Sequence, residues 1–220
     1  MPEELFGPEY PKIETVYLRD ERKLIIPGAW TTDEFRYLAD CEWRWTEKVD
    51  GTNIRVHWNG ERVTVGGRTD SAQVPTFLLA ALQPLLEPGR FAAIFPDGNA
   101  TLYGEGYGPK IQGGHQYRDD PTLILFDVRV GAWWLKPDDI EDVASKLGLE
   151  VVPPKGCWTL RDAVARVEAE LLYSHWTGAR IEGLVGTPTV SLFDRAGHRI
   201  VAKIKGKDFA DLRRRGGPRA

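Results

Sequence analysis

The 220-residue sequence contains few of the residues that build metal centres and disulfide frameworks. Its two cysteines, Cys41 and Cys157, form no CxxC pair, and its four histidines are scattered along the chain. Zinc centres need several such ligands at close spacing, and disulfide frameworks need a larger, regularly spaced set of cysteines. We therefore expect neither, and the low cysteine content is typical of a cytoplasmic protein.

Long apolar runs are also missing. The stretch Phe91–Phe95 covers five residues, whereas a membrane-spanning helix needs about 20. No secretory signal is recognisable, so we expect no association with a membrane. A composition of 42% hydrophobic and 28% charged residues is that of an ordinary globular protein. Because no repeat, low-complexity tract or long linker interrupts the chain, we expect a single domain over residues 1–220.

Two common nucleotide-binding motifs are absent as well. The sequence has no GxxxxGK[ST] loop, which excludes a P-loop, and no strand–GxGxxG–helix unit of the dinucleotide-binding kind. The glycine-rich stretch Gly104–Gly108 is not followed by a helical pattern. Any phosphate chemistry in this chain must therefore depend on other residues.

The charge is distributed unevenly along the chain. Residues 1–198 carry 21 Lys and Arg against 30 Asp and Glu, whereas the last 22 residues carry 8 basic residues against 2 acidic ones. Such a basic end fits a partner that bears phosphates. Part of it, Arg213–Arg215, is interpreted either as a small phosphate-contacting patch or as a solvated terminus.

Several segments have the alternating pattern of β-strands. Ile54–Trp58 and Arg62–Val65 alternate apolar and polar residues around Asn59-Gly60, which predicts a β-hairpin. Arg55 faces away from Ile54 in this pattern, so its side chain is expected to reach phosphate or solvent. Leu123–Val130 and Ala132–Leu135 predict a second hairpin across Gly131. Two further strands are predicted at Ile181–Val185 and Arg199–Ile204.

Helical patterns are fewer. Apolar residues recur at helical spacing in Val74–Leu86, Asp138–Leu147 and Thr159–Leu172, and Thr159 is the expected N-cap of the third helix. These helices do not alternate with the strands as βαβ units require. We therefore predict an α+β fold with mainly antiparallel sheets.

The chemistry-bearing motifs occur in a defined order. Glu47–Asn53, with the sequence EKVDGTN, follows the aromatic segment Trp43–Trp45 and precedes the first hairpin. The motifs that follow it in the chain are Gly67–Thr69, Tyr103–Gly108, Phe126–Val128, Glu182–Val185 and Ala202–Lys205.

This ordered series resembles that of the covalent nucleotidyltransferases, the superfamily of polynucleotide ligases and mRNA capping enzymes, over about residues 43 to 209. The first motif and Tyr103–Pro109 are most similar to RNA ligases of the phage and RNA-editing type. The resemblance implies two antiparallel β-sheets flanked by helices, as in an ATP-grasp-like adenylyltransferase domain, with the nucleotide between them. It also implies ATP as substrate, magnesium or manganese as cofactor, and RNA or DNA ends or nicks as partners.

The resemblance implies a role for each matching residue. Lys48 would attack the α-phosphate of ATP and carry AMP, and Glu182 would bind the divalent ion. The other implied roles are adenine contact by Glu47, shaping of the pocket by Asp50 and Asn53, phosphate contact by Arg68, ribose contact by Glu105, purine stacking by Phe126 and α-phosphate contact by Lys203 and Lys205.

Physical chemistry agrees with the role of the lysines. A lysine attacks phosphorus only as the neutral amine, so neighbouring cations and burial must lower its pKa. Lys203 and Lys205 point to the same face of a strand, with Ile204 on the opposite face. They can hold phosphate and supply those cations. The alternative is a solvated, lysine-rich edge strand.

The resemblance leaves several functions open. Asp50 stands where editing-type RNA ligases commonly have histidine, and aspartate there is the pattern of DNA ligases and capping enzymes. About 15 residues follow Lys205, so we expect no oligonucleotide-binding barrel at the C-terminus. We expect an RNA ligase, with a DNA ligase, a GTP-using guanylyltransferase and an end-binding subunit of a repair complex as alternatives. A protein partner could supply substrate binding.

Overall fold

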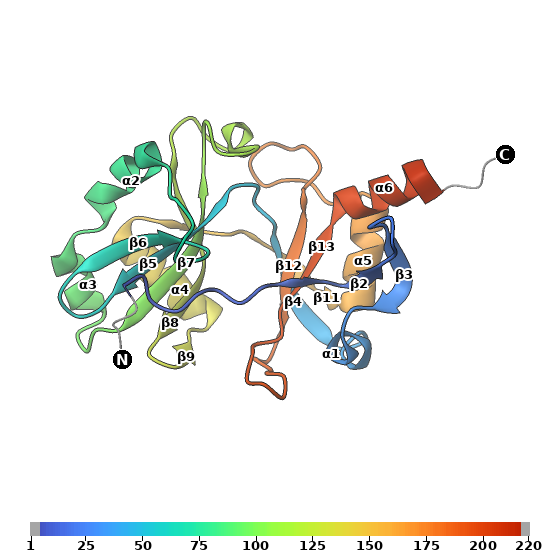
Figure 1. Ribbon diagram of the computed structural model, residues 1–220, viewed down its shortest axis with the longest axis horizontal. Coiled ribbons are helices and arrows are strands. Elements are labelled where there is room, and N and C mark those ends of the chain that lie inside the picture. Colours follow the sequence, from blue (N-terminus) through green and yellow to red (C-terminus); the bar gives the residue numbers. More distant parts are fainter. Residues whose placement is uncertain (1–4, 217–220) are drawn as a thin grey trace. The chain divides into compact units, whose positions relative to one another are not determined.

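The computed structural model describes residues 5–216, and its packing divides the chain into two compact units. Unit 1 consists of Met1–Tyr10 and Val49–Val152, and unit 2 of Pro11–Lys48 and Pro153–Ala220. The chain therefore passes from unit 2 into unit 1 directly after Lys48 and returns after Val152. Each unit has its own sheet (Figure 1), and each has its own hydrophobic core.

Unit 1 is built on a six-stranded sheet. Its strands lie in the order β10-β8-β7-β5-β6, with β9 paired to β8, and β10 runs parallel to β8. Ile54, Val56 and Trp58 point to one face of β5 and are buried against the helices. The elements are β5 (Thr52–Trp58), β6 (Val63–Gly67), α2 (Thr76–Leu82), the 3₁₀ helix η1 (Gln83–Leu85), α3 (Pro88–Ile94), β7 (Ala100–Tyr107), the 3₁₀ helix η2 (Gly114–Gln116), β8 (Thr122–Val130), β9 (Trp133–Trp134), α4 (Pro137–Leu147) and β10 (Glu150–Val151).

Unit 2 is built on a five-stranded sheet in the order β1-β13-β12-β4-β11, and a two-stranded sheet β2-β3 accompanies it. β1 is parallel to β13 and the other pairs in the five-stranded sheet are antiparallel. The elements are β1 (Glu14–Thr15), β2 (Tyr17–Arg19), β3 (Ile25–Trp30), α1 (Asp33–Tyr37), β4 (Glu42–Glu47), β11 (Pro154–Thr159), α5 (Leu160–Glu168), β12 (Gly183–Pro188), β13 (Ala202–Lys205) and α6 (Gly206–Gly216).

The predicted α+β class with mainly antiparallel sheets is confirmed, and so are both predicted hairpins. In the first hairpin the Asn59 side chain accepts hydrogen bonds from the N–H groups of Glu61 and Arg62. The helix predicted over Val74–Leu86 changes from α to 3₁₀ geometry at Gln83–Leu85. Pro84 lies in that turn and has no N–H to continue the α-helix.

The helix that begins at Thr159 is shorter than its apolar pattern predicts. Thr159 is the N-cap, because its hydroxyl accepts from the N–H of Asp162, but α5 ends at Glu168 instead of Leu172. Glu170 adopts a left-handed conformation with φ 55°, and the N–H of Leu171 donates to the carbonyl of Arg166. This closure of the helix normally uses glycine, so a glutamate in its place gives no signal in the sequence.

Two further observations concern the apolar segments and the cysteines of the described residues. No helix within residues 5–216 has both the length and the hydrophobicity of a membrane span. Cys41 and Cys157 are free thiols, and both are exposed.

Candidate active site

Lys48, Lys203 and Lys205 lie on one face of the unit 2 sheet, which we call the lysine face. The first of them follows strand β4. Trp43 and Trp45 point into the core, where their rings stack with centroids 5.6 Å apart, and the intervening residues face the other side of the sheet. Lys48 follows β4 and donates its N–H to the carbonyl of Gly183 at 2.9 Å. Leu184 is paired with Glu47 and Gly183 with Lys205, so Lys48, Gly183 and Lys205 lie at one level across three strands.

Gly183 allows strands β12 and β13 to approach each other closely at this level of the sheet. A Cβ at this position would lie 2.0 Å from the carbonyl oxygen of Ile204, which is far shorter than any allowed contact. Any larger residue would therefore push β12 away from β13. Strand pairing places Lys48 and Lys205 on the same face of the sheet. Because Gly183 lies between them, β12 contributes no side chain at this level.

The prediction for Lys203 and Lys205 is confirmed in its geometry. Ala202 and Ile204 are buried in the core, and the two lysines alternate with them on the opposite face. Burial, followed by the charge of Lys205, lowers the pKa of Lys203, and Lys48 and Lys12 act in the same direction while Glu14 opposes them. The cationic cluster that the sequence suggested is present in unit 2.

Glu182 pairs with the predicted nucleophile. Its Oε2 lies 2.7 Å from the Nζ of Lys48, and both side chains are about one-quarter exposed. No group of three or more His, Cys, Asp or Glu residues suited to a metal ion occurs in the described part of the chain. A single carboxylate fits Mg²⁺ or Mn²⁺ where substrate phosphate oxygens complete the coordination. Glu182 therefore fits a divalent ion that arrives with a phosphate, in exchange for Lys48.

Glu47 lies on the other face of the sheet from Lys48, next to the tryptophan core. Its side chain is 1% exposed, and its Oε2 lies 2.7 Å from the Nζ of Lys155 and accepts from the N–H of His175 at 3.0 Å. Its Oε1 is buried without a hydrogen-bond partner among residues 5–216. No local pattern points to Lys155, because the pairing joins residues that are distant along the chain.

Unit 1 brings together a second group of predicted residues. Asn53 of β5 is paired with Glu105 of β7, so the two side chains lie side by side on one face. The Oδ1 of Asn53 is buried without a hydrogen-bond partner in the described chain. Arg68 comes one residue after the Ile54–Gly67 pair, next to Asn53 in the register, and is exposed.

Phe126 and Asp50 complete the group in unit 1. Phe126 lies at the irregularity in the β7–β8 pairing, and the ring of Tyr10 contacts it edge-on at 5.1 Å between centroids. Asp50 accepts from the N–H of Gly113 at 3.0 Å through Oδ2, and its own N–H donates to the hydroxyl of Tyr117 at 3.3 Å. Asp50 therefore holds the segment after β7 in place.

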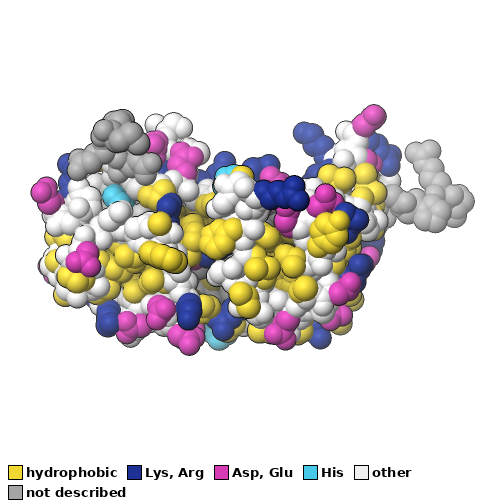
Figure 2. Space-filling model, turned by 90° about the horizontal axis from the view of Figure 1, so that it is seen from below, with side chains coloured by type: hydrophobic (Ala, Val, Ile, Leu, Met, Phe, Trp, Pro, Cys, Tyr) yellow, Lys and Arg dark blue, Asp and Glu magenta, His cyan; other side chains and the backbone are white. Residues whose placement is uncertain are grey.

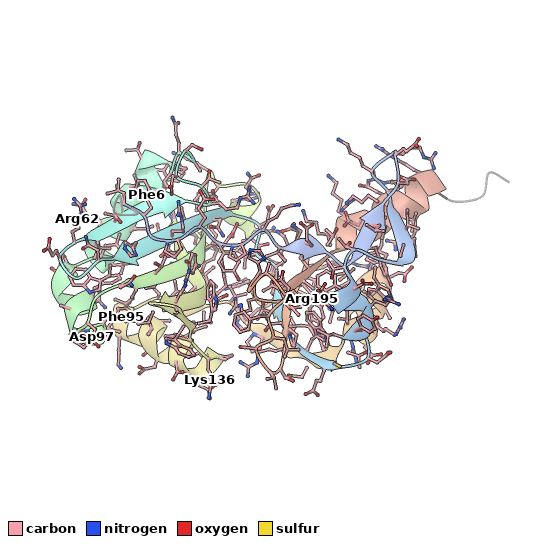
Figure 3. All side chains as sticks on the ribbon, turned by 60° about the horizontal axis from the view of Figure 1, so that its bottom comes forward. Phe6, Arg62, Phe95, Asp97, Lys136 and Arg195 are labelled. Atoms are coloured by element: carbon pink, nitrogen blue, oxygen red, sulfur yellow. The ribbon has the colours of Figure 1, made fainter. Side chains whose placement is uncertain are left out.

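Arg55 corrects an expectation. Its side chain does not reach solvent, because it is completely buried and donates to the carbonyls of Gly67 and Gly7, each at 2.7 Å. Phe6, labelled in Figure 3, has its ring centroid 6.0 Å from the guanidinium. Alternation along a strand shows which face a residue takes, but not that a second segment covers that face.

The basic C-terminal residues make contacts of their own. Arg213 donates to the carbonyl of Glu168 and pairs with Glu170, and Arg214 pairs with Asp211. On the face shown in Figure 2, Lys and Arg side chains are interspersed with Asp and Glu instead of forming one basic field. The interpretation of Arg213–Arg215 as a phosphate-contacting patch stays a prediction.

These features define a class of protein. The lysine beside a glutamate and a lysine pair on the unit 2 sheet matches the motif pattern of a covalent nucleotidyltransferase. A sequence model of the RNA ligase family matches residues 41–205, and the chain belongs to this family. No curated protein sequence matches it.

Solved structures of an RNA ligase from Naegleria gruberi share the fold. The ligase with pyrophosphate has a TM-score of 0.62 at 20% identity, over 98% of this chain and 63% of that chain. A mutant with ATP and Mn gives 0.62 at 17% identity, over 93% and 63%, and a mutant with AMP and Mn gives 0.61 at 19%, over 96% and 62%. This chain therefore spans less than two thirds of the length of these ligases.

Proposed function

We propose that this chain is an ATP-dependent RNA ligase that joins 5′-phosphate and 3′-hydroxyl ends through a covalent lysyl-AMP at Lys48. The observation that carries the proposal is the lysine face of unit 2. Lys48 lies level with Lys205 across Gly183, on the same face as Lys203, and its Nζ is 2.7 Å from Glu182. Family membership supports the choice of reaction, and the ligands of the Naegleria gruberi structures support ATP and a divalent metal.

The proposed reaction has three steps. The neutral amine of Lys48 attacks the α-phosphorus of ATP, which forms a P–N bond, breaks the bond to the β-phosphate and releases pyrophosphate. An oxygen of the 5′-phosphate then attacks the AMP phosphorus, and the P–N bond breaks. Finally, the 3′-hydroxyl attacks the activated 5′-phosphate, which forms the phosphodiester and releases AMP.

The residues of unit 2 have distinct roles in this proposal. Lys203 and Lys205 hold the α-phosphate and stabilise the charge of the transition state. Glu182 holds the ammonium of Lys48 in the free protein, and Lys48 must leave this ion pair and lose its proton before it attacks. Glu182 would then be the ligand of a divalent ion, which supplies charge neutralisation on the phosphates. The adenine contact proposed for Glu47 rests on the family resemblance, and its Oε1, buried without a hydrogen-bond partner among residues 5–216, is a free acceptor.

The residues of unit 1 would bind the rest of the nucleotide. Glu105 accepts from the ribose hydroxyls, and the neighbouring Asn53, whose Oδ1 is buried with no partner in the described chain, takes part in the same contact. Phe126 stacks on the purine, and Arg68 contacts phosphate from its exposed position. Asp50 shapes this pocket through its hold on the segment at Gly113. We also propose that residues 1–220 form a single nucleotidyltransferase domain, that the protein is cytoplasmic, and that a protein partner assists substrate binding.

Labelling tests the proposal directly. Incubation with α-labelled ATP and Mg²⁺ or Mn²⁺ should leave a protein-bound label that is absent in Lys48→Ala and stronger with ATP than with GTP. Lys146→Ala is the matched control, because the side chain of Lys146 lies in an exposed ion pair with Asp142 on α4, and it should label like the wild type. A wild type that takes no label, or a Lys48→Ala variant that still takes it, would refute the proposal.

A DNA ligase is the second candidate, and Asp50 is the feature that favours it. The hydrogen bond from Gly113 to Asp50 gives this carboxylate a local role that does not depend on the type of nucleic acid. Sealing of nicked duplexes that carry RNA or DNA on the 3′-hydroxyl side separates the two candidates. We expect faster sealing with RNA, and a clear preference for DNA would replace the first candidate with the second.

A further inference from the structure

A buried ion pair lies directly behind the lysine face. Lys155 and Glu47 have side chains that are 12% and 1% exposed, with Nζ and Oε2 2.7 Å apart. Burying two charges is costly unless further hydrogen bonds satisfy them. Lys155 makes one such bond to the carbonyl of Tyr173 at 2.7 Å, and Glu47 makes another to the N–H of His175 at 3.0 Å.

The backbone around Lys155 is shaped for this contact. The pairing of β11 with β4 shifts register between Pro154 and Gly156, so Lys155 is the extra residue of a β-bulge. Gly156 has a positive φ of 148°, and a Cβ there would lie 2.6 Å from the ring of Trp158. A bulge of this kind re-aims one side chain out of the regular alternation, and here that side chain is the ammonium that reaches Glu47.

Lys155 and Glu47 each form a hydrogen bond to the backbone of the same loop, Leu172–Ile181. The N–H of Ile181 donates to the carbonyl of Leu172, and Tyr173 and Arg180 form an antiparallel bridge. The outgoing arm of the loop is therefore coupled to the returning arm. The returning arm ends at Glu182, whose carbonyl accepts from the N–H of Gly206 at 2.9 Å and whose carboxylate pairs with Lys48.

The ion pair of Lys155 with Glu47 is therefore connected to both residues of the Lys48–Glu182 contact. Glu47 is the residue before Lys48, and its own N–H donates to the carbonyl of Pro153, the residue before β11. On the other side, Lys155 and Glu47 fix the loop that leads to Glu182. A displacement of about 1 Å between reacting groups can slow a reaction by about a hundredfold, so this bracing bears on the rate of the chemical step.

We propose that Lys155 is a positioning residue for the adenylation of Lys48: from its bulge it fixes Glu47 and the loop Leu172–Ile181, and through them it sets the position of Glu182 beside the lysine face. This inference rests on the proposed function, because it concerns the same reaction. Lys155 touches neither Lys48 nor the catalytic carboxylate of Glu182 among its hydrogen bonds and ion pairs in the described chain.

The experiment compares single-turnover formation of lysyl-AMP in four proteins. Lys155→Met should lower the rate at saturating ATP by about tenfold or more, with a change of less than about threefold in the KM for ATP. Lys155→Arg should recover most of the rate, because a guanidinium can donate both to Glu47 and to the carbonyl of Tyr173. Lys146→Met is the matched control, since Lys146 lies in an exposed ion pair, and should be unchanged.

A double variant separates positioning from folding. Glu47→Gln with Lys155→Met removes both charges, so no unpaired charge remains buried, and its thermal stability should stay close to that of the wild type. We expect this stable protein to be as slow as Lys155→Met at saturating ATP, where a weaker contact of residue 47 to adenine does not limit the rate. A double variant that forms lysyl-AMP at the wild-type rate would overturn the inference while leaving the proposed function intact. A wild type that does not label would instead overturn the proposed function.

Discussion

Replacement of Arg55 by methionine tests whether this residue serves the fold or the phosphates of a nucleotide. Its side chain is fully buried and makes three hydrogen bonds of 2.7 Å, to the carbonyls of Gly67 and Gly7 and to Asp70. Methionine can replace the apolar stem of the arginine but none of its donors. Arg55→Met should therefore destabilise unit 1 and leave the chemistry of Lys48 intact.

The magnitude follows from the three acceptors. Each buried carbonyl that loses its donor costs about 1–3 kcal/mol. The loss of the contact to Asp70 adds little, because that side chain is 70% exposed and can be hydrated. With a small offset from the added apolar contacts, we expect a loss of about 2–5 kcal/mol in the free energy of unfolding. This is a large fraction of the roughly 5–15 kcal/mol that stabilises a typical domain.

Urea unfolding followed by tryptophan fluorescence measures this loss. Arg22→Met is the matched control, because Arg22 is 70% exposed and lies 3.9 Å from Asp20, and it should change the stability by less than about 0.5 kcal/mol. The rate of lysyl-AMP formation by Arg55→Met, measured without urea at a temperature at which the variant is folded, should be close to that of the wild type. A variant that is as stable as the wild type but fails to label would show that Arg55 serves phosphate binding and would refute the reasoning.

Three further predictions concern the lysine face. Gly183→Ala should lower the free energy of unfolding by about 1–3 kcal/mol through overpacking against Ile204, and it should slow labelling. Gly89→Ala, with open space around its Cβ, is the control and should be neutral. If the two variants had equal effects in thermal melts and in labelling, the prediction would be wrong. Glu182→Gln should lower labelling by about a hundredfold or more at any Mg²⁺ concentration, and full activity would exclude Glu182 from the site. Lys203→Met should be more stable than the wild type at pH 7, because the depressed pKa of Lys203 means that its protonation opposes folding. This gain should fade as the pH rises from the lowered pKa toward 10.5, and a melting-temperature difference that does not change with pH would contradict the assignment.

Local patterns in the sequence were sufficient for much of the fold. The Asn59-Gly60 turn, the N-cap at Thr159 and the alternation of Lys203 with Ile204 are each determined by neighbours a few residues away. The features that could not be predicted depend on distant partners. The coverage of Arg55 by the segment at Gly7, the two-residue parallel strand β1, and the contact between Glu47 and Lys155 all join segments that are far apart in the chain.

In the candidate site, the position of each residue within its strand matters more than the spacing between the motifs. In unit 2 three motifs meet at one level of the sheet, because Lys48, Gly183 and Lys205 are aligned by backbone pairing. The number of residues in the loops between the strands can vary without disturbing this alignment, since the loops lie outside the paired strands. The position of each residue within its strand cannot vary, because a shift by one residue turns a side chain to the opposite face. Glu47 and Lys48 illustrate this rule: adjacent in the chain, they lie on opposite faces, one with the buried Lys155 and the other with Glu182. The order and phase of such motifs therefore carry information about a site even where overall sequence identity is low.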